Sequence, residues 1–468
     1  MDPHVKQDPE PEPEPEPERA SIPAMAAAYS IPDPAITELV DAPPTPTLSV
    51  DPTRSYALQL EPLGMPSIEE RALPELKLGG MRFSPDLLFP TRMDSNGGRM
   101  GTAPLLLELP APGSDAAPAG LAFVGLPAGH ALSFVTWAPT GGKLAFMARP
   151  GGQASAHYEL WIADWSTGAA ACSQLLPSHR FNAVTGPPYV WSKDGERLLV
   201  KTVPASLGPV PAAPAAPPGP TIQDNSDGAA AAARTYQDMI SSPHDEMLFA
   251  HCSTCALLLL TLSSGEALTV GPAEGMMLRG SHAPSNSGMV DGALAVSPDG
   301  RYIVSQRFES PFSYSEQFSK FAYTTEVFSA ETGELCSSVF SSPLQESVPT
   351  HTDGVVTGPR SMKWVPFLDA TLIFAAAADG GDPEADVGPD GVRDELFLLE
   401  EPFDLQSARL ALQMSLRYRR LVFVPPGDEG SGAAAIVSES RWSDRKLKEC
   451  KPHDYRWHLG CVFQRFQR

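Results

Sequence analysis

The sequence predicts an all-β fold of repeated four-stranded antiparallel sheets, arranged as a β-propeller. The chain has 50 Pro and 38 Gly among its 468 residues, a larger share than the roughly 12% that these two residues have in average usage. This excess favours turns over helices. From about residue 45, a pattern of two alternating apolar runs around a turn of Pro, Asp or Gly recurs along the chain. A second hairpin follows these runs, so each unit supplies four strands, and repeats of about 40 to 60 residues are typical of propeller blades.

The first hairpin of each unit has apolar residues at every second position, and Pro, Asp and Gly favour the tight turn between its strands. The clearest copy runs from Leu294 through Ser297-Pro298-Asp299-Gly300 to Val304. The copies cover residues 47–58, 134–146, 189–200, 294–304, 362–374 and 421–437. Second hairpins are clearest at residues 160–168, 257–266 and 325–334.

One unit is longer than the others. Trp191 follows Trp137 by 54 residues, whereas Val296 follows Trp191 by 105 residues. The excess contains a Pro/Ala-rich stretch, residues 203–233, which we interpret as a strandless loop between the two hairpins of one blade. Lengthening a surface loop costs only about 0.6 kcal/mol per doubling. The chain therefore predicts about five and a half blades, namely five blades and the first hairpin of a sixth.

Composition sets the expected domain boundaries. Residues 1–40 are predicted to be a disordered acidic arm, because the Pro-Glu alternation from Pro9 to Glu18 removes amide donors and places repelling carboxylates together. Residues 41–440 form the incomplete propeller. Residues 441–468 are basic, with eight Lys or Arg and three Asp or Glu. This tail is either an interaction tail or, the favoured alternative, an aberrant or truncated C-terminus.

The charge and the apolar runs disfavour several classes of partner. The net charge is -22, which repels nucleic acid and anionic membrane surfaces. The apolar run around Ala256 to Leu260 is too short to span a bilayer, and the acidic start lacks a signal or transit pattern. Six irregularly spaced cysteines favour a reducing compartment. We expect no nucleic acid and no membrane as partners, and the oligomeric state is left open.

Three tryptophans, Trp137, Trp191 and Trp364, occupy equivalent positions in the repeated hairpin. Large aromatic side chains at repeated positions favour packing between neighbouring blades over stacking on a ligand.

Two other patterns could carry chemistry. Cys252 and Cys255 form a C-x-x-C, but no second pair exists, so a structural role is favoured over a zinc or redox site. The acidic loop 379–382, with Asp386 and Asp390, lacks the calcium-loop spacing and is interpreted as a solvated hairpin loop.

The sequence contains no G-x-S-x-G elbow, phosphate-binding loop or dinucleotide fingerprint. We therefore predict no catalytic residue, no cofactor-binding residue, no metal ligand and no cofactor.

An ordered string of segments, spread over residues 30 to 445, nevertheless resembles a known family. It is similar to the N-terminal propeller part of the chloroplast glutamyl endopeptidases, which are serine peptidases of the prolyl-oligopeptidase type. The matching segments are residues 39–46, 71–82 (with Lys77-Leu78-Gly79-Gly80-Met81-Arg82), 134–146, 234–239, 311–314, 360–364 and 379–382.

The resemblance implies proteolysis after acidic residues in the chloroplast stroma. Family members carry an α/β-hydrolase domain after the propeller, where Ser attacks the peptide carbonyl, His acts as base and Asp orients His. The propeller would frame access for peptides or unfolded proteins. No family catalytic residue has a matching position here, so we expect a fragment that is inactive alone.

An alternative interpretation is a stand-alone propeller that binds peptides or proteins without catalysis. The acidic arm also departs from the import peptide typical of the family, and the location would otherwise be cytoplasmic.

Overall fold

The structure, a computed structural model, describes most of the chain. The described residues are 32–42, 44–91, 100–151, 156–166, 168–214, 236–280, 294–347, 353–387, 389, 391–424 and 434–441, together with the backbone of 446–450. The chain divides into two compact units, Met1–Pro44 and Thr45–Arg468.

The first unit contains one short helix, α1 (Pro34–Val40). The side chain of Asp33 accepts a hydrogen bond from Ala35 N at 2.9 Å, and Pro34 occupies the first turn, where its missing N–H is tolerated. Residues 34–40 are therefore helical, without a buried side chain, and the disordered arm stays a prediction. Residues 1–31 lie outside the described residues.

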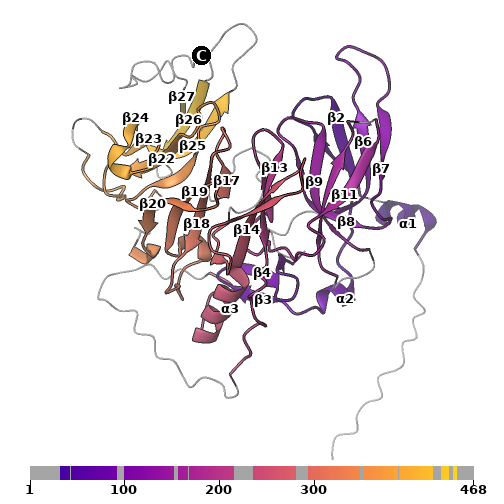
Figure 1. Ribbon diagram of the computed structural model, residues 1–468, viewed down its shortest axis with the longest axis horizontal. Helices are drawn as coiled ribbons and strands as arrows, with labels where there is room; N and C mark the ends of the chain where they lie inside the picture. The colour runs from indigo at the N-terminus through magenta and orange to yellow at the C-terminus, as the bar shows by residue number, and fades with distance from the viewer. Residues whose placement is uncertain are drawn as a thin grey trace, which may run out of the picture. The chain divides into compact units, whose positions relative to one another are not determined.

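Antiparallel sheets make up most of the second unit (Figure 1). The largest has the strand order β1-β2-β6-β7-β11-β10-β9-β8. Its strands are β1 (Thr47–Val50), β2 (Tyr56–Pro62), β6 (Gly101–Glu108), β7 (Ala119–Val124), β8 (Ala131–Trp137), β9 (Lys143–Arg149), β10 (Glu159–Asp164) and β11 (Ala170–Leu175).

The following sheets have the orders β12-β13-β14-β15, β17-β18-β19-β20, β21-β22-β23-β24 and β25-β26-β27, and β16 pairs with β14. Their strands are β12 (Tyr189–Trp191), β13 (Arg197–Thr202), β14 (Thr254–Thr261), β15 (Ala267–Val270), β16 (Met276–Met277), β17 (Leu294–Val296), β18 (Tyr302–Phe308), β19 (Tyr323–Ser329), β20 (Leu335–Ser342), β21 (Arg360–Trp364), β22 (Leu372–Ala377), β23 (Asp394–Leu399), β24 (Arg409–Met414), β25 (Arg417–Val424), β26 (Ala434–Arg441) and β27 (Lys446–Cys450).

Smaller elements complete the second unit. A small sheet has the order β3-β4-β5. These elements are α2 (Ile68–Arg71), β3 (Leu76–Leu78), β4 (Met81–Ser84), β5 (Phe89–Pro90), α3 (Pro243–Ser253), η1 (Phe318–Lys320), η2 (Gln345–Ser347) and η3 (Leu405–Ser407).

The repeated hairpins form as predicted, and their turn residues explain why. In the β17–β18 turn, the Ser297 hydroxyl accepts from Tyr302 N at 2.9 Å and donates to Asp299 Oδ1 at 2.5 Å. Gly300 adopts a φ of 74°, which costs little without a side chain. Ser192 makes the same contacts in the β12–β13 turn. The mostly-β fold of antiparallel hairpins is confirmed.

The first two predicted units are not separate sheets. Strand β7 pairs in parallel with β11 at Ala170↔Phe123, and β6 pairs with β8 at Gly101↔Leu132, which closes a ring of six strands. Gly125, at the end of β7, permits this approach, because a Cβ there would lie 2.8 Å from Cys172 O. The prediction of independent four-stranded sheets is therefore wrong for β1 to β11.

The long unit forms one sheet, in which four strands follow the order β12-β13-β14-β15. Strands β13 and β14 pair directly although 51 residues separate them, and residues 203–214 form no strand. The rest of the Pro/Ala-rich stretch lies outside the described residues. The same connection contains α3, which the sequence did not predict, although Ser242 caps its N-terminus by accepting from Asp245 N at 3.1 Å.

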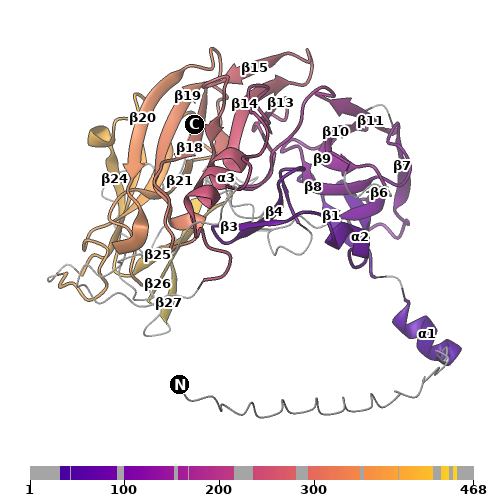
Figure 2. The same cartoon turned by 90° about the horizontal axis from the view of Figure 1, so that it is seen from below.

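The core lies between neighbouring sheets, which pack face to face (Figures 1 and 2). For example, Leu199 and Leu257 of one sheet share an apolar cluster with Ile303 and Phe328 of the next. Each sheet with four or more strands shares such a cluster with the next large sheet along the chain, up to the sheet that contains β25 and β26. Apolar burial between sheets is therefore the main interaction that joins them.

Candidate functional site

Five of the seven segments that carried the family resemblance gather in two places. The first is the sheet β3-β4-β5. Gly80 N donates to Asp238 O at 2.9 Å, and Arg82 Nε donates to Asp238 Oδ2 at 2.7 Å. Phe318 N donates to Gly79 O at 2.9 Å. Segments 71–82 and 234–239, which are far apart in sequence, therefore form one contact.

Helix α3 covers this small sheet, and Figures 1 and 2 both place it beside β3 and β4. The ring of Phe249 in α3 lies 5.4 Å from Phe308, 4.7 Å from Phe312 and 5.2 Å from Phe321 between centroids. Phe312 belongs to the matching segment 311–314. Buried edge-to-face rings add stability beyond their area, so this place is a packed structural cap.

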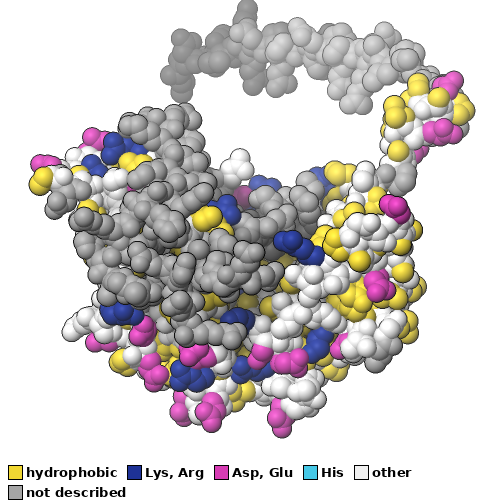
Figure 3. All heavy atoms as spheres, turned by 90° about the horizontal axis from the view of Figure 1, so that it is seen from above, with side chains coloured by type: hydrophobic (Ala, Val, Ile, Leu, Met, Phe, Trp, Pro, Cys, Tyr) yellow, Lys and Arg dark blue, Asp and Glu magenta, His cyan; other side chains and the backbone are white. Residues whose placement is uncertain are grey.

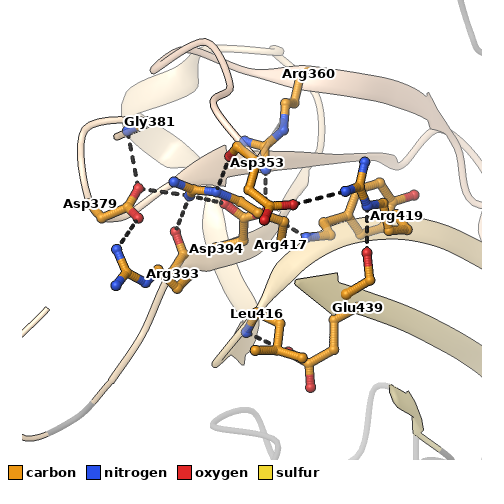
Figure 4. A network of polar contacts seen from close by, with 12 residues as sticks. Asp353, Arg360, Asp379, Gly381, Arg393, Asp394, Leu416, Arg417, Arg419 and Glu439 are labelled. Carbon is orange, nitrogen blue, oxygen red and sulfur yellow. Dashed lines mark hydrogen bonds and ion pairs between the residues drawn. The ribbon is translucent and has the colours of Figure 1, made fainter. Parts of the chain in front are cut away.

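The second place is a buried network of arginines and aspartates (Figure 4). Arg417 of β25 has a side chain only 3% exposed. Its Nε donates to Asp353 O at 2.9 Å, and its Nη1 donates to Asp379 Oδ1 at 2.7 Å and Asp394 Oδ1 at 3.1 Å. Arg360 of strand β21 also donates to Asp394 of β23. The network therefore joins the matching segments 360–364 and 379–382 to the last sheet.

The side chain of Asp379 is completely buried, with an exposed fraction of 0%. Arg393 Nη1 donates to its Oδ2 at 2.9 Å, and Gly381 N donates to its Oδ1 at 3.0 Å. Burial raises the pKa of Asp379, but the hydrogen bonds and charges of Arg417 and Arg393 outweigh burial and hold the pKa below its usual value.

The interpretation of residues 379–382 as a solvated loop is therefore wrong for Asp379. Asp382 does fit a turn, because its Oδ1 accepts from Glu384 N at 2.9 Å in an exposed position. Asp390 lies outside the described residues. The Arg417 partner lies 38 residues further along the chain, so the local pattern could not indicate the burial.

The three tryptophans make similar contacts through their indole N–H groups. Trp191 and Trp364 donate to a strand of the preceding sheet, whereas Trp137 of β8 donates to β1 of its own eight-stranded sheet. The contacts are Trp137 to Ser49 Oγ at 2.9 Å, Trp191 to Thr136 Oγ1 at 3.0 Å and Trp364 to Ala295 O at 3.3 Å. The predicted role in packing between neighbouring sheets is confirmed for Trp191 and Trp364.

Cys252 and Cys255 lie where α3 ends and β14 begins, and both are buried and free. Burial raises the pKa of Cys252 to about 12 and that of Cys255 to about 11. A reactive thiol needs a lowered pKa, as at a helix N-terminus, whereas Cys252 occupies a helix C-terminus. These observations support the structural interpretation.

Lys201 in β13 is a buried cation that sequence reasoning missed. Its side chain is 1% exposed, and its Nζ donates to Gly186 O at 2.9 Å. Burial lowers its pKa to about 8, against a small opposing effect from Cys255. An alternating strand normally points Lys to solvent, but here both faces of the sheet are covered.

An open groove of about 590 Å³ lies between the sheets of β15 and β20. Arg307 lies in it and pairs with Glu326 and Glu309, at 3.1 Å each. Phe328 and Met276 supply apolar wall. The groove has room for a peptide segment.

Other chemistry-bearing groups are spread apart. Among the described residues, no cluster of three His, Cys, Asp or Glu could hold a metal ion. None of the helices in the described ranges is long and apolar enough to cross a bilayer. On the face drawn in Figure 3, basic and acidic side chains lie interspersed among the coloured residues.

Comparison with curated proteins gives two long matches. The chain is 30% identical over 423 residues to a probable glutamyl endopeptidase, chloroplastic, of Oryza sativa subsp. japonica, which covers 90% of this chain. It is 30% identical over 427 residues to the protein of the same name in Arabidopsis thaliana, which covers 91%. The predicted resemblance is confirmed. The chain spans 41% of the length of each of these glutamyl endopeptidase relatives, and no protein-family model matches it.

Comparison with solved structures gives weaker similarities. The β-propeller domain of the Trilobed protease from Pyrococcus furiosus has a TM-score of 0.35 at 10% identity, with 87% of this chain and 84% of that chain covered. Dipeptidyl peptidase 4 from Porphyromonas gingivalis has a TM-score of 0.38 at 9% identity, with 88% and 48% covered. These TM-scores are low, so the arrangement of the sheets rests on the contacts described above.

Proposed function

We propose that this chain is the β-propeller part of a glutamyl-endopeptidase-like serine peptidase, with about five and a half blades. The observation that carries the proposal is the 30% identity to two glutamyl endopeptidases across about nine tenths of the chain. The repeated face-to-face packing of sheets and the shared indole contacts support a propeller.

The exposure of strand β1 supports a propeller ring that continues beyond the described sheets. Leu48 and Val50 of β1 are 64% and 54% exposed, on the outermost strand of its sheet. An apolar pair left uncovered on such a strand fits a further sheet packed against it.

In this proposal, the propeller admits and orients peptides or unfolded proteins, and groups outside residues 1–468 cleave the peptide bond after an acidic residue. A serine nucleophile, a histidine base and an orienting aspartate would supply that chemistry. The two relatives are named as chloroplastic, which supports a chloroplast location for this chain, and we propose the stroma.

A second candidate is a stand-alone propeller that binds peptides without cleaving them. The groove of about 590 Å³ beside Arg307 favours it, because it is large enough for a peptide segment and needs no further domain.

The purified chain tests both candidates. It is incubated with a Glu-containing peptide, with and without a serine-directed covalent inhibitor, and peptide binding is measured in parallel. We expect no inhibitor-sensitive cleavage by the chain alone. Cleavage that the inhibitor blocks would contradict the placement of the catalytic groups. Tight peptide binding that Arg307→Gln weakens would favour the stand-alone module.

A further inference from the structure

The groove between the sheets of β15 and β20 carries more acid than base. The described residues that line it include one cation, Arg307, and two carboxylates, Glu326 and Glu334. Arg307 also pairs with Glu309, so three carboxylates against one guanidinium leave a net charge of -2. The charge of Arg307 is therefore neutralised within the groove, and the excess favours a positively charged ligand group.

Glu326 brings an open carboxylate oxygen to this groove. Its side chain is only 8% exposed, and its Oε1 accepts from Arg307 Nη2 at 3.1 Å. Its Oε2 has no hydrogen-bond donor among the described residues and is not fully enclosed by protein. Because a carboxylate accepts on both oxygens, Oε2 is a position for a charged donor from outside the chain.

Glu334 and Leu335 form the β20 side of the same groove. The backbone N–H of Glu334 donates to Thr332 Oγ1 at 3.2 Å, whereas its exposed carboxylate has no partner in the described part of the chain. Leu335 is 52% exposed and leaves an apolar surface beside that carboxylate. Lys and Arg pack their aliphatic stems on apolar surface while the charged head reaches further, so both side chains suit this wall.

We propose that the groove binds a lysine or arginine side chain of a peptide. The charged head lies between Glu326 Oε2 and the Glu334 carboxylate, and the aliphatic stem lies against Leu335. The volume of about 590 Å³ leaves room for neighbouring peptide residues. The inference rests on the second candidate function, peptide binding in this groove, and adds the class of side chain that the groove selects.

The test compares three labelled peptides that differ only at one central residue, which is Lys, Gln or Glu. Binding to the purified full chain is measured by fluorescence anisotropy at low ionic strength. We expect the Lys peptide to bind about fivefold more tightly than the Gln peptide, as one partly buried charge pair allows, and the Glu peptide to bind most weakly. Equal affinities, tightest binding of the Glu peptide or no binding would overturn the proposal.

Variants locate the preference, because the net charge of -22 attracts any basic peptide. Glu334→Gln changes an exposed side chain and should reduce the preference for Lys over Gln about twofold. Leu335→Ser should weaken binding of the Lys peptide. The matched control is Glu108→Gln, which removes an exposed carboxylate from β6, outside the groove, and should change neither value. An equal preference for Lys in Glu334→Gln and Glu108→Gln would overturn the site.

The outcomes separate this inference from the proposed functions. Equal binding of the three peptides overturns the inference and leaves peptide binding in place. Absence of any binding overturns both the inference and the second candidate. Neither result bears on the peptidase proposal, which is tested by cleavage.

Discussion

Replacement of Arg417 by Met tests the energetic role of the buried network. Met retains most of the length of the side chain but removes the guanidinium that contacts Asp353, Asp379 and Asp394 at 2.7 to 3.1 Å. Asp379 and Asp394 are completely buried and would each lose one of their arginine partners. Removing one partner of a buried pair typically costs about 3–5 kcal/mol, so we expect Arg417→Met to lower the unfolding free energy by that amount.

Arg409→Met is the matched control. Arg409 also pairs with a carboxylate, Glu400, at 2.5 Å, but their side chains are 41% and 52% exposed. An exposed pair contributes about 1 kcal/mol or less. Both variants are compared with the unaltered chain by urea unfolding followed by tryptophan fluorescence. Equal losses for the two variants, or a loss below about 1 kcal/mol for Arg417→Met, would refute the reasoning.

Three further predictions concern other buried groups. Lys201→Met should stabilise the chain by about 1–2 kcal/mol at pH 7. The shift of the Lys201 pKa from 10.5 to about 8 corresponds to a cost of about 3 kcal/mol for the buried ammonium, and loss of its hydrogen bond to Gly186 O offsets part of the gain. Burial of this ammonium destabilises the folded chain by the full amount below about pH 8, and the destabilisation disappears towards pH 10.5. Urea unfolding of the unaltered chain should therefore show an unfolding free energy that rises between about pH 8 and pH 10.5, and a flat profile would count against the burial of Lys201. Asp379→Asn should make the stability of the chain less sensitive to acid. The Asp379 carboxylate has a lowered pKa in the folded chain, so it contributes stability above pH 3.8 that is lost as the pH falls through the folded pKa. Acid unfolding curves identical to those of the unaltered chain would exclude this contribution of Asp379. Trp191→Phe should cost about 1 kcal/mol for the bond to Thr136 plus the lost packing, and an unchanged denaturation midpoint would show that this contact between sheets contributes nothing.

Local features of the fold could be predicted from the sequence, because local residues determine them. The turn Ser297-Pro298-Asp299-Gly300 contains its own hydrogen-bond donors and acceptors, so its pattern specifies the hairpin. Helix α3 was missed because Met247, Leu248 and Phe249 are consecutive and do not follow helical spacing. Its capping signal, Ser242 followed by Pro243, was present and could have indicated it.

Features that depend on distant partners could not be predicted. The junction of the first two units needs Gly125 to approach Cys172, and no local pattern indicates a parallel pairing of two residues. Asp379 is buried only because Arg417 and Arg393 neutralise it. Without knowledge of these partners, the acidic and Gly-rich composition of residues 379–382 indicates a solvated loop.

The central claim is that this chain is the propeller of a glutamyl-endopeptidase-like peptidase. The most direct measurement is the activity of a hybrid enzyme, in which residues 45–441 replace the matching segment of the Arabidopsis thaliana relative. The account predicts a soluble hybrid that cleaves a Glu-containing peptide, spares its Gln counterpart and is blocked by a serine-directed inhibitor. A folded hybrid that cleaves neither peptide, while the unaltered relative cleaves the first, would contradict it.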